Sequence, residues 1–370
     1  MQHSHPPNTI RTRITPAKAA LFTTILVLAT LLSLEGAIRI WAYYFRSTYE
    51  TYNATKGRYE PVPGVHPIAG GPPLIINSKG FIGPEFEAEK PKDVYRIFSI
   101  GDSCTFGNMD VVYPGLVHTR LNAEGNGKKF EVLNAGVEGY HSGFALARLK
   151  EDVLQYNPDL VTIYVGWNDF MKVNPENLGE VGRYAWLGRL MEQSYLVKAY
   201  KKVLFSYVRP LVVKPNVVST PEDLHAYDSF EPSGFRDNLV EMIHILKSRN
   251  IKILILTRPT VVREGMSYED IMRQHVVFPW YGSAYSVNKL LSLHRAYNRT
   301  IRNVAIQEGV PLLDLDADFE RRDRSGLFWD TMHPNEKGHR LIADQVFRRL
   351  QDVMQSDSHA GMVEASGSQG

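Results

Sequence analysis

Short apolar runs alternate with segments of helical periodicity through most of the chain, and this alternation restricts the fold more than any other feature of the sequence. The runs of strand length are 94–100, 130–134, 160–165, 251–257 and 311–315. The stretches with helical period lie near 112–124, 142–156, 234–249 and 286–308. Strands that alternate with helices form a parallel sheet with right-handed crossovers, and helices cover both of its faces. We therefore expect an α/β fold.

The composition is that of a globular protein with one main domain. The chain has 370 residues, of which 44% are hydrophobic and 22% are charged, so it can bury a sizeable core. The formal net charge is +2, and the basic residues do not form a long patch interleaved with aromatic residues, so we expect no nucleic acid partner. Cys104 is the single cysteine, which excludes an intramolecular disulfide and a cysteine-based zinc cluster.

The N-terminus predicts one transmembrane helix. Residues 1–18 are polar and basic, and residues 19–34 carry no charge. The apolar character continues past Glu35 to Ile38, which gives the run the roughly 20 residues that a helix needs to span a bilayer. No Ala-x-Ala-like site follows, so we expect an uncleaved signal anchor over 19–38 in preference to a cleaved signal peptide.

The charges around this run predict its orientation. The basic tail, 1–18, is favoured on the cytoplasmic side, which makes the protein a single-pass membrane protein with its main domain outside the cytoplasm. Basic residues also follow the run, and they weaken the charge asymmetry on which this orientation rests: Arg39, Arg46, Lys56 and Arg58.

Ser103 is the candidate functional centre. The first strand-length run stops at Gly101-Asp102-Ser103, a sequence that can turn sharply into a helix. A hydroxyl at the carboxyl end of a parallel strand lies at the mouth of the sheet, where open α/β folds bind their ligands. Gly-Asp-Ser is also ordinary turn composition, so the tripeptide alone does not identify a site.

Three later blocks follow the other strands. Asn134-Ala-Gly-Val-Glu-Gly139 and Gly166-Trp-Asn-Asp169 follow the second and third strands, and Asp330-Thr-Met-His333-Pro-Asn precedes the last helix. Together with Gly-Asp-Ser they resemble the four blocks of the SGNH or GDSL hydrolase family, in the family's order and roughly its spacing. The resemblance covers about 94–351. It implies a three-layer α/β/α sandwich with a mostly five-stranded parallel sheet, here preceded by one transmembrane helix.

The resemblance implies a catalytic triad of Ser103, His333 and Asp330. A serine hydroxyl is a poor nucleophile unless a base within hydrogen-bond reach takes its proton and a third group orients that base. His333 is the expected base, and Asp330 is expected to orient it. Each residue also has a structural interpretation, since His-Pro often starts a helix and aspartate is a good helix cap.

The resemblance also implies an oxyanion hole. It assigns this role to the backbone amides of Ser103 and Gly139 and to the side-chain amide of Asn168. A glycine suits the role because the backbone can approach the substrate closely. Gly136 is an alternative for the second donor, and an Asx-turn is the alternative role for Asn168.

Other polar residues are interpreted as structural. Asp102 is expected to fix the nucleophile turn, and Asp169 is expected to brace its own loop. The segment 314–318 is similar to a calcium loop, but Phe319 stands where the glycine belongs and Ser325 where the bidentate glutamate belongs, so we predict no metal and no cofactor. Cys104 could replace Ser103 as nucleophile, but a buried small side chain is favoured.

The remaining segments complete the predicted organisation. Residues 39–92 are rich in Tyr, Pro and Gly and predict a stalk or pre-domain segment. Residues 93–355 form the hydrolase domain. The insertion, 170–231, contains an amphipathic stretch with a basic side, which predicts a packed helix or, alternatively, a lid or membrane contact. Residues 356–370 predict a disordered tail.

The predicted function is hydrolysis of a carboxylic ester. The expected substrate is an acyl or acetyl ester of a cell-envelope lipid or glycan, cleaved through a seryl-ester intermediate. Two alternatives remain: an O-acyltransferase that passes the acyl group to a sugar hydroxyl, and a non-catalytic binding module of the same fold. The sequence does not indicate the acyl length or the oligomeric state.

Overall fold

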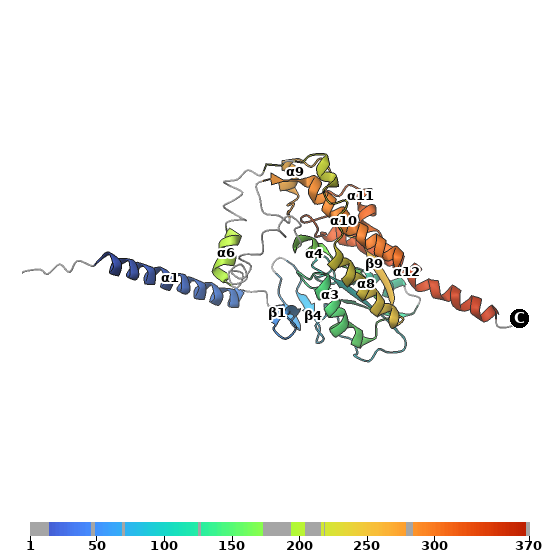
Figure 1. Ribbon diagram of the computed structural model, residues 1–370. Helices are drawn as coiled ribbons and strands as arrows, with labels where there is room; N and C mark the ends of the chain where they lie inside the picture. The colour runs from blue at the N-terminus through green and yellow to red at the C-terminus, as the bar shows by residue number, and fades with distance from the viewer. Residues whose placement is uncertain are drawn as a thin grey trace, which may run out of the picture. The chain divides into compact units, whose positions relative to one another are not determined.

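The computed structural model describes residues 15–45, 49–68, 71–124, 127–172, 194–203, 216–217, 219–278 and 284–367. The chain divides into two compact units. The first comprises 1–47 and 179–214, and the second comprises 48–178 and 215–370. The second unit contains the sheet and all the strands (Figure 1).

The first unit contains a long apolar helix. Helix α1 (Pro16–Phe45) includes the predicted anchor and extends beyond it at both ends. Its segment Pro16–Trp41 is long and apolar enough to cross a membrane, a property that an N-terminal signal sequence shares. The other described helix of this unit is α6 (Tyr195–Val203), which lies in the predicted insertion. The rest of the predicted amphipathic stretch, 186–193 and 204, lies outside the described residues.

Glu35 caps helix α6. Its carboxylate accepts hydrogen bonds from the Ser194 hydroxyl at 2.8 Å and from the backbone N–H groups of Tyr195 and Leu196 at 3.0 and 2.7 Å. Arg39, one turn further along α1, pairs with the same carboxylate at 2.7 Å. A carboxylate at a helix N-terminus satisfies N–H groups that have no partner inside the helix. The acidic residue within the apolar run therefore has a specific structural role.

The second unit is built on a five-stranded sheet in the order β11-β9-β7-β5-β6, and every neighbouring pair in it is parallel. The bounds are β5 (Val94–Gly101), β6 (Lys129–Asn134), β7 (Leu160–Tyr164), β9 (Lys252–Leu256) and β11 (Leu312–Leu313). Strand β5 pairs with β6 on one side and β7 on the other, so Ser99 is opposite both Asn134 and Thr162. The chain therefore runs from β5 outward to β6 and then crosses back over β5 to β7.

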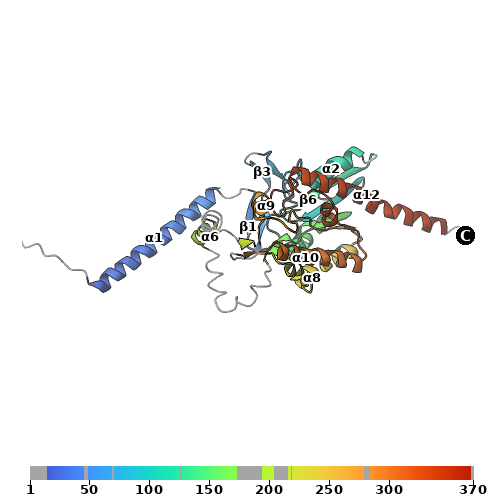
Figure 2. The same cartoon turned by 90° about the horizontal axis from the view of Figure 1, so that it is seen from above.

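Helices cover both faces of this sheet, as the sequence predicts. Helices α2 (Tyr113–Glu124) and α12 (Glu336–Gly367) pack together on one face, and α3 (Ser142–Arg148), α8 (Ser233–Ser248) and α10 (Val287–Gln307) lie on the other (Figure 2). A π-turn (Leu149–Val153) and a 3₁₀ turn (Leu154–Tyr156) extend α3. The shorter elements are α4 (Trp167–Lys172), η4 (Glu222–His225), α9 (Tyr268–Arg273), α11 (Leu315–Glu320), β8 (Asn216–Val217) and β10 (Ala284–Tyr285). The three-layer α/β/α architecture is confirmed.

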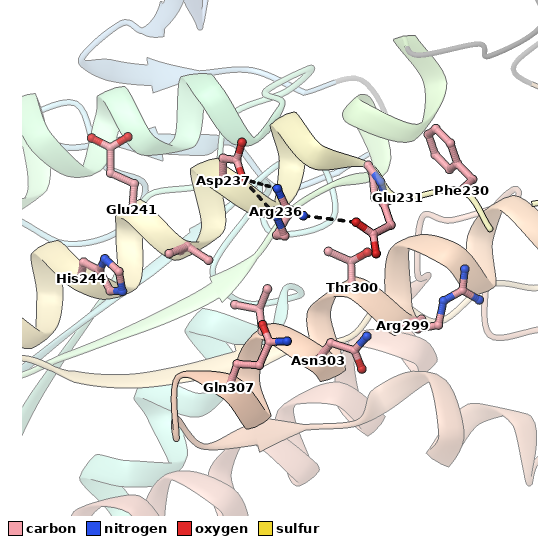
Figure 3. Close-up of a pocket in the computed structure, with 13 residues that line it drawn as sticks. Phe230, Glu231, Arg236, Asp237, Glu241, His244, Arg299, Thr300, Asn303 and Gln307 are labelled. Atoms are coloured by element: carbon pink, nitrogen blue, oxygen red, sulfur yellow. Dashed lines mark hydrogen bonds and ion pairs between the residues drawn. The ribbon is translucent and has the colours of Figure 1, made fainter. Parts of the chain in front are cut away.

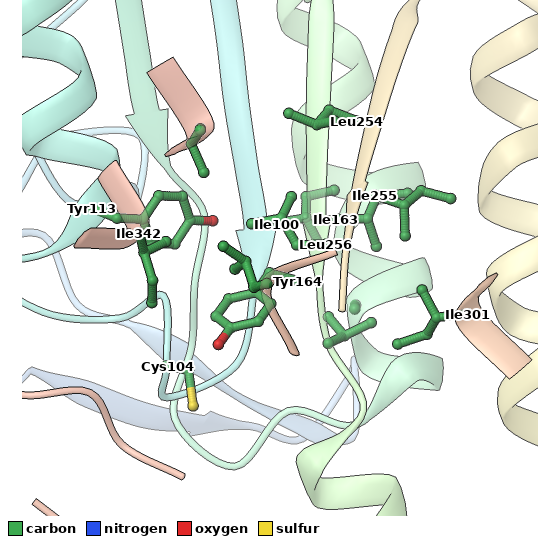
Figure 4. Packing of buried hydrophobic residues seen from close by; sticks show 14 of the residues in the cluster. Ile100, Cys104, Tyr113, Ile163, Tyr164, Leu254, Ile255, Leu256, Ile301 and Ile342 are labelled. Atoms are coloured by element: carbon green, nitrogen blue, oxygen red, sulfur yellow. The ribbon is translucent and has the colours of Figure 1, made fainter. Parts of the chain in front are cut away.

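The core fills the space between the sheet and its helices. Strand β7 is buried at every position, as expected for a central strand of a parallel sheet. Figure 4 shows Tyr113 and Ile342 on one side of the strands and Ile301 on the other. Cys104 belongs to the same core and is 1% exposed, so its predicted structural role agrees with its position.

The segment before β5 was predicted as a stalk or pre-domain segment over 39–92. From residue 48 the chain belongs to the second unit. It forms two antiparallel pairs, β1 (Glu50–Asn53) with β2 (Arg58–Pro61) and β3 (Gly64–His66) with β4 (Leu74–Ile76). The apolar residues showed no period because they come from short hairpins and turns, whose buried positions are unevenly spaced.

Phe81 anchors this segment in the core. Its side chain is fully buried, and its ring centroid lies 5.0 Å from that of Phe98 on β5. The next residue, Ile82, exchanges backbone hydrogen bonds with Asn134 at the end of β6. Arg148 of α3 donates to the carbonyl of Gly80 at 2.8 Å. The N-terminal segment is thus joined to β5, to β6 and to α3.

The C-terminal segment 356–370, for which the sequence predicts a disordered tail, begins within helix α12. This helix runs to Gly367. Extending an existing helix adds one hydrogen bond for each residue fixed and does not repeat the cost of nucleation. Polar composition alone therefore does not stop a helix that begins in the folded domain.

We expect Phe81→Ala to lower the free energy of unfolding by about 3–5 kcal/mol, because it leaves a cavity in a fully packed site. Urea denaturation of full-length protein in detergent measures this change. Ile75→Ala is the matched control, since Ile75 is on the same segment but is 51% exposed. Equal stability of the two variants would mean that the segment is peripheral to the core.

Candidate active site

The nucleophile turn begins where β5 ends. The backbone N–H of Thr105 donates to the carbonyl of Asp102, and the N–H of Cys104 donates to the Asp102 carboxylate, both at 2.9 Å. A Cβ on Gly101 would lie 1.8 Å from Oγ1 of Thr105, so only glycine allows the turn to close this tightly. Asp102 therefore fixes the turn as predicted, and Ser103 is left half-buried at its apex.

The structure brings Ser103, His333 and Asp330 together. The Ser103 Oγ lies 2.8 Å from His333 Nε2, and His333 Nδ1 lies 2.7 Å from Asp330 Oδ2. The other carboxylate oxygen of Asp330 accepts from the backbone N–H groups of Met332 and His333, both at 2.9 Å. Asp330 is thus oriented by the turn that carries the histidine, and the histidine is oriented toward the serine.

The environment shifts the pKa values of the acid and the base in opposite directions. Burial raises the pKa of Asp330, but hydrogen bonds from His333 and from the N–H groups of Met332 and His333 outweigh it and lower the pKa overall. Burial lowers the pKa of His333, but the hydrogen bond and negative charge of Asp330, with the charges of Asp102 and Glu138, outweigh it and raise the pKa. The pair therefore favours a negative Asp330 and stabilises a protonated His333.

The loop after β6 carries Gly139, one of the two further residues predicted for the oxyanion hole. Gly139 is exposed and has a φ of +70°, a conformation that favours glycine. The side-chain Nδ2 of Asn168 donates to the carbonyl of the next residue, Tyr140, at 2.9 Å. This contact holds Asn168 against the loop. Because a carboxamide has two N–H groups, one of them is still available as a donor.

Gly136, the alternative donor, has a different role. Its N–H donates to Oδ1 of Asn134 at 2.9 Å, so this amide is already engaged. A Cβ at this position would lie 2.6 Å from the backbone nitrogen of Phe106. Gly136 therefore allows the loop after β6 to pack against the nucleophile turn.

Asp169 braces the segment after the Gly139 loop, whereas the sequence predicts that it braces its own loop. Its carboxylate accepts from the backbone N–H of Ser142 at 2.8 Å and from the Ser142 hydroxyl at 2.6 Å. Ser142 begins helix α3 and follows the loop that carries Gly139. Asn168 and Asp169 thus hold both ends of the segment 140–142.

Arg258 is a residue near the site that the sequence analysis missed. Its guanidinium is fully buried, and within the described part of the chain no atom accepts a hydrogen bond from it. It lies over the rings of Trp167, Phe235 and Tyr297, at 5.2, 5.7 and 5.3 Å from their centroids. Burial raises the pKa of Asp102, and the positive charge of Arg258 opposes that rise. Its position directly after β9 is the only signal in the sequence, since site residues of parallel sheets follow strands.

A cavity of about 660 Å³ opens over Ser103, Asp330 and His333. One wall comes from the N-terminal segment, through Tyr49, Ile68, Pro72 and Leu74, and further lining residues are Phe106, Val111, Val112, Glu138 and Trp329. The predicted lid residues near 187–191 lie outside the described residues. The N-terminal segment, interpreted from the sequence as a stalk, thus borders the candidate site.

A second cavity, of about 540 Å³, lies between α8 and α10 (Figure 3). Arg236 forms ion pairs there with Glu231 and Asp237, and none of the candidate site residues lines it. Over the residues described, no group of three His, Cys, Asp or Glu side chains is placed to hold a metal ion. The carboxylates of Asp314 and Asp316 instead pair with Arg302, each at 2.8 Å.

A serine, a histidine and an aspartate hydrogen-bonded in series at the end of a parallel strand are the arrangement of an α/β serine hydrolase. The comparisons agree with this class. The family model described as the GDSL-like Lipase/Acylhydrolase family matches residues 99–341, which is more than half of the chain. The chain belongs to this family and is an ester-hydrolysing enzyme.

Several solved structures resemble the chain in fold. An acetyl xylan esterase, AlAXEase, is 21% identical, with 68% of this chain and 98% of that chain covered and a TM-score of 0.41. A lipase/acylhydrolase from Enterococcus faecalis is 19% identical, with 70% and 96% covered and a TM-score of 0.42. The acetylxylan esterase Axe2 from Geobacillus stearothermophilus is 18% identical, with 69% and 93% covered and a TM-score of 0.41. No curated protein matches the chain.

We expect the pKa of His333 to lie above its ordinary value of 6.5 and to fall below it in Asp330→Asn, because burial then acts without the opposing carboxylate. Proton NMR titration of the histidine ring signals measures both values, with His333→Gln used for assignment. His118, whose pKa burial lowers, serves as the control and should titrate alike in both proteins. An unchanged His333 pKa would contradict the assigned Asp330 contact.

Proposed function

We propose that the protein hydrolyses a carboxylic ester through a seryl-ester intermediate on Ser103. The observation that carries the proposal is the hydrogen-bonded series from Ser103 Oγ through His333 to Asp330. A binding module of the same fold would not need a serine, a histidine and an aspartate hydrogen-bonded in series. Their presence favours catalysis over the non-catalytic alternative.

Acylation begins with attack by the serine. As Ser103 Oγ forms a bond to the ester carbonyl carbon, His333 Nε2 takes the hydroxyl proton. The carbonyl oxygen becomes negative and is stabilised by the backbone N–H groups of Ser103 and Gly139 and by the side-chain amide of Asn168. The carbon–oxygen bond to the alcohol then breaks, and His333 returns the proton to the departing oxygen. The acyl group remains on Ser103.

Deacylation repeats these steps with water. His333 takes a proton from water, whose oxygen attacks the acyl carbon, and the carboxylic acid leaves when Ser103 Oγ recovers its proton. Asp330 stabilises the imidazolium that forms in each half-reaction.

The pKa of His333 predicts the pH dependence of the reaction. Because this pKa is raised, the neutral, proton-accepting form of His333 is lost at a higher pH than for an ordinary histidine. Activity should therefore fall as the pH drops through that raised pKa.

Ser103→Ala should abolish both turnover of p-nitrophenyl acetate and labelling by a fluorophosphonate probe, because it removes the hydroxyl that is proposed to form the covalent intermediate. Asn168→Ala should retain labelling but slow turnover by about a hundredfold, the effect of losing one oxyanion donor. Circular dichroism checks that both variants fold. Labelling of folded Ser103→Ala protein would assign the nucleophile elsewhere, and turnover only after a sugar is added would favour the acyltransferase.

The proposed setting of the reaction is the outer side of the cytoplasmic membrane, on an acyl or acetyl ester of the cell envelope. The support is helix α1, whose apolar span is preceded by a basic tail and followed by no recognisable cleavage site. An anchored enzyme is confined to substrates that reach the membrane surface. Soluble cytoplasmic esters are excluded by the proposed topology.

Full-length protein should pellet with membranes, resist carbonate extraction and keep its natural N-terminus. Protease added outside the cytoplasmic membrane should digest the catalytic unit, because the basic tail favours the opposite side. Quantitative immunoblotting and N-terminal sequencing measure these outcomes. A mature protein that begins near residue 38 would mean a cleaved signal peptide, and protection of the whole domain would reverse the topology.

A further inference from the structure

Trp329 is an exposed aromatic residue at the candidate site. Its side chain is 69% exposed, whereas the preceding Phe328 is 6% exposed. Trp329 lines the same cavity as Ser103 and His333. Large aromatic side chains contribute more free energy when they are buried, so an exposed tryptophan beside a nucleophile is a candidate ligand contact.

The backbone on which Trp329 stands is fixed. Phe328 and Pro334 form a β-bridge, and the N–H of Trp329 donates to the carbonyl of His333 at 2.8 Å. The ring of Phe328 packs against that of Phe319, with centroids 5.6 Å apart. Trp329 is therefore held on the same turn as Asp330 and His333, and its position relative to the base is set by that turn.

The direction of proton transfer determines which part of an ester meets this turn. His333 Nε2 must return its proton to the departing alcohol oxygen, so that oxygen lies on the His333 side of Ser103. The carbonyl oxygen points instead toward the donors on Gly139 and Asn168. The alcohol portion thus lies against the turn that carries Trp329. The apolar wall formed by Ile68, Pro72 and Leu74 is left for the acyl group.

The charges around the cavity restrict that alcohol. Glu138 and Glu336 line it, and among its described lining residues there is no lysine or arginine. Glu336 is paired with Arg340 at 2.7 Å, whereas Glu138 accepts a hydrogen bond from the Tyr49 hydroxyl at 3.4 Å. Carboxylates accept hydrogen bonds from hydroxyl groups and repel anions. A neutral, hydroxyl-bearing alcohol fits this lining, and an anionic one does not.

We propose that Trp329 binds the alcohol portion of the substrate and that this alcohol is an uncharged sugar. One face of the sugar ring stacks on the indole, and hydroxyl groups at its edge approach Glu138. This assignment rests on the proposed ester hydrolysis and adds the class of alcohol to it. Trp329 acts in binding and takes no part in proton transfer.

The kinetic test compares two acetate esters with full-length protein in a detergent that has no sugar headgroup. Trp329→Ala should raise KM for acetylated methyl glucoside about tenfold with little change in kcat, the size expected for one aromatic contact. Trp329→Ala should hydrolyse ethyl acetate at the rate of wild type, because the alcohol of this ester is too small to contact the indole. Trp329→Phe should restore part of the loss. Tyr268→Ala is the control, since Tyr268 is also exposed but does not line the cavity.

Equal effects of Trp329→Ala on the two esters, or no effect on either, would overturn the assignment. Acetylated methyl glucuronide has the same ring with a carboxylate in place of the hydroxymethyl group, and its hydrolysis should be slower. Equal rates for the two sugars, each acetylated at the same ring hydroxyl, would overturn the restriction to neutral sugars. Calorimetry with Ser103→Ala protein separates this inference from the proposed hydrolysis. In that protein, Trp329→Ala should weaken binding of acetylated methyl glucoside about tenfold, even if wild type cleaves neither ester. Unchanged binding would refute the assignment of Trp329 to sugar binding.

Discussion

The position of β5 between two parallel neighbours is the constraint on which the rest of the site depends. Because β6 and β7 pair with opposite edges of β5, and β7 is followed by β9 on its far side, the connections that leave β5 and β7 diverge at the carboxyl ends of the strands. Ser103 stands at this divergence, where open sheets form their ligand crevices. The loop after β6 and the loop after β7 reach the same place from opposite sides. The hydrogen bond from Asn168 to the carbonyl of Tyr140 joins the loop after β7 to the loop after β6.

Much of this arrangement could be predicted from the sequence, because parallel strands that are buried on both faces are continuous apolar runs. The runs that contain β5, β6 and β7 were identified within one or two residues, and so was the turn that carries Ser103. Asp330 and His333 were predicted because the segment 330–335 resembles the last block of the family. The apolar runs and the turn are local signals, and their physical basis does not depend on distant contacts.

Other features could not be predicted, because they depend on contacts that the local pattern does not encode. The segment 39–92 was predicted as a stalk or pre-domain segment without any hairpin, since the buried positions of two short hairpins follow neither helical nor strand periodicity. Glu35 has no partner that the sequence pattern indicates, because the groups that it binds are Ser194, Tyr195 and Leu196, roughly 160 positions away in the sequence. Arg258 has only its place after β9 to distinguish it. In each case the missing information is the identity of a distant partner.

Three buried arginines show how the N-terminal segment is held. Arg58 of β2 pairs with Asp152 at 2.9 Å, and Arg148 donates to the carbonyls of Gly80 and Ala135 at 2.8 and 3.0 Å. Arg96 of β5 pairs with Glu131 at 2.7 Å and donates to the carbonyl of Glu87 at 2.8 Å. Guanidinium groups that are removed from water need several acceptors, and here the N-terminal segment supplies some of them.

The N-terminal segment lines part of the catalytic cavity but is separate in sequence from the groups that react. The family blocks begin near residue 99, while Tyr49, Ile68 and Leu74 precede them and carry none of the reacting groups. Substitutions in residues 49–74 can therefore reshape the cavity and leave the proton-transfer groups unchanged. In this chain the shape of the cavity is set in part by residues that lie outside the segment matched by the family model.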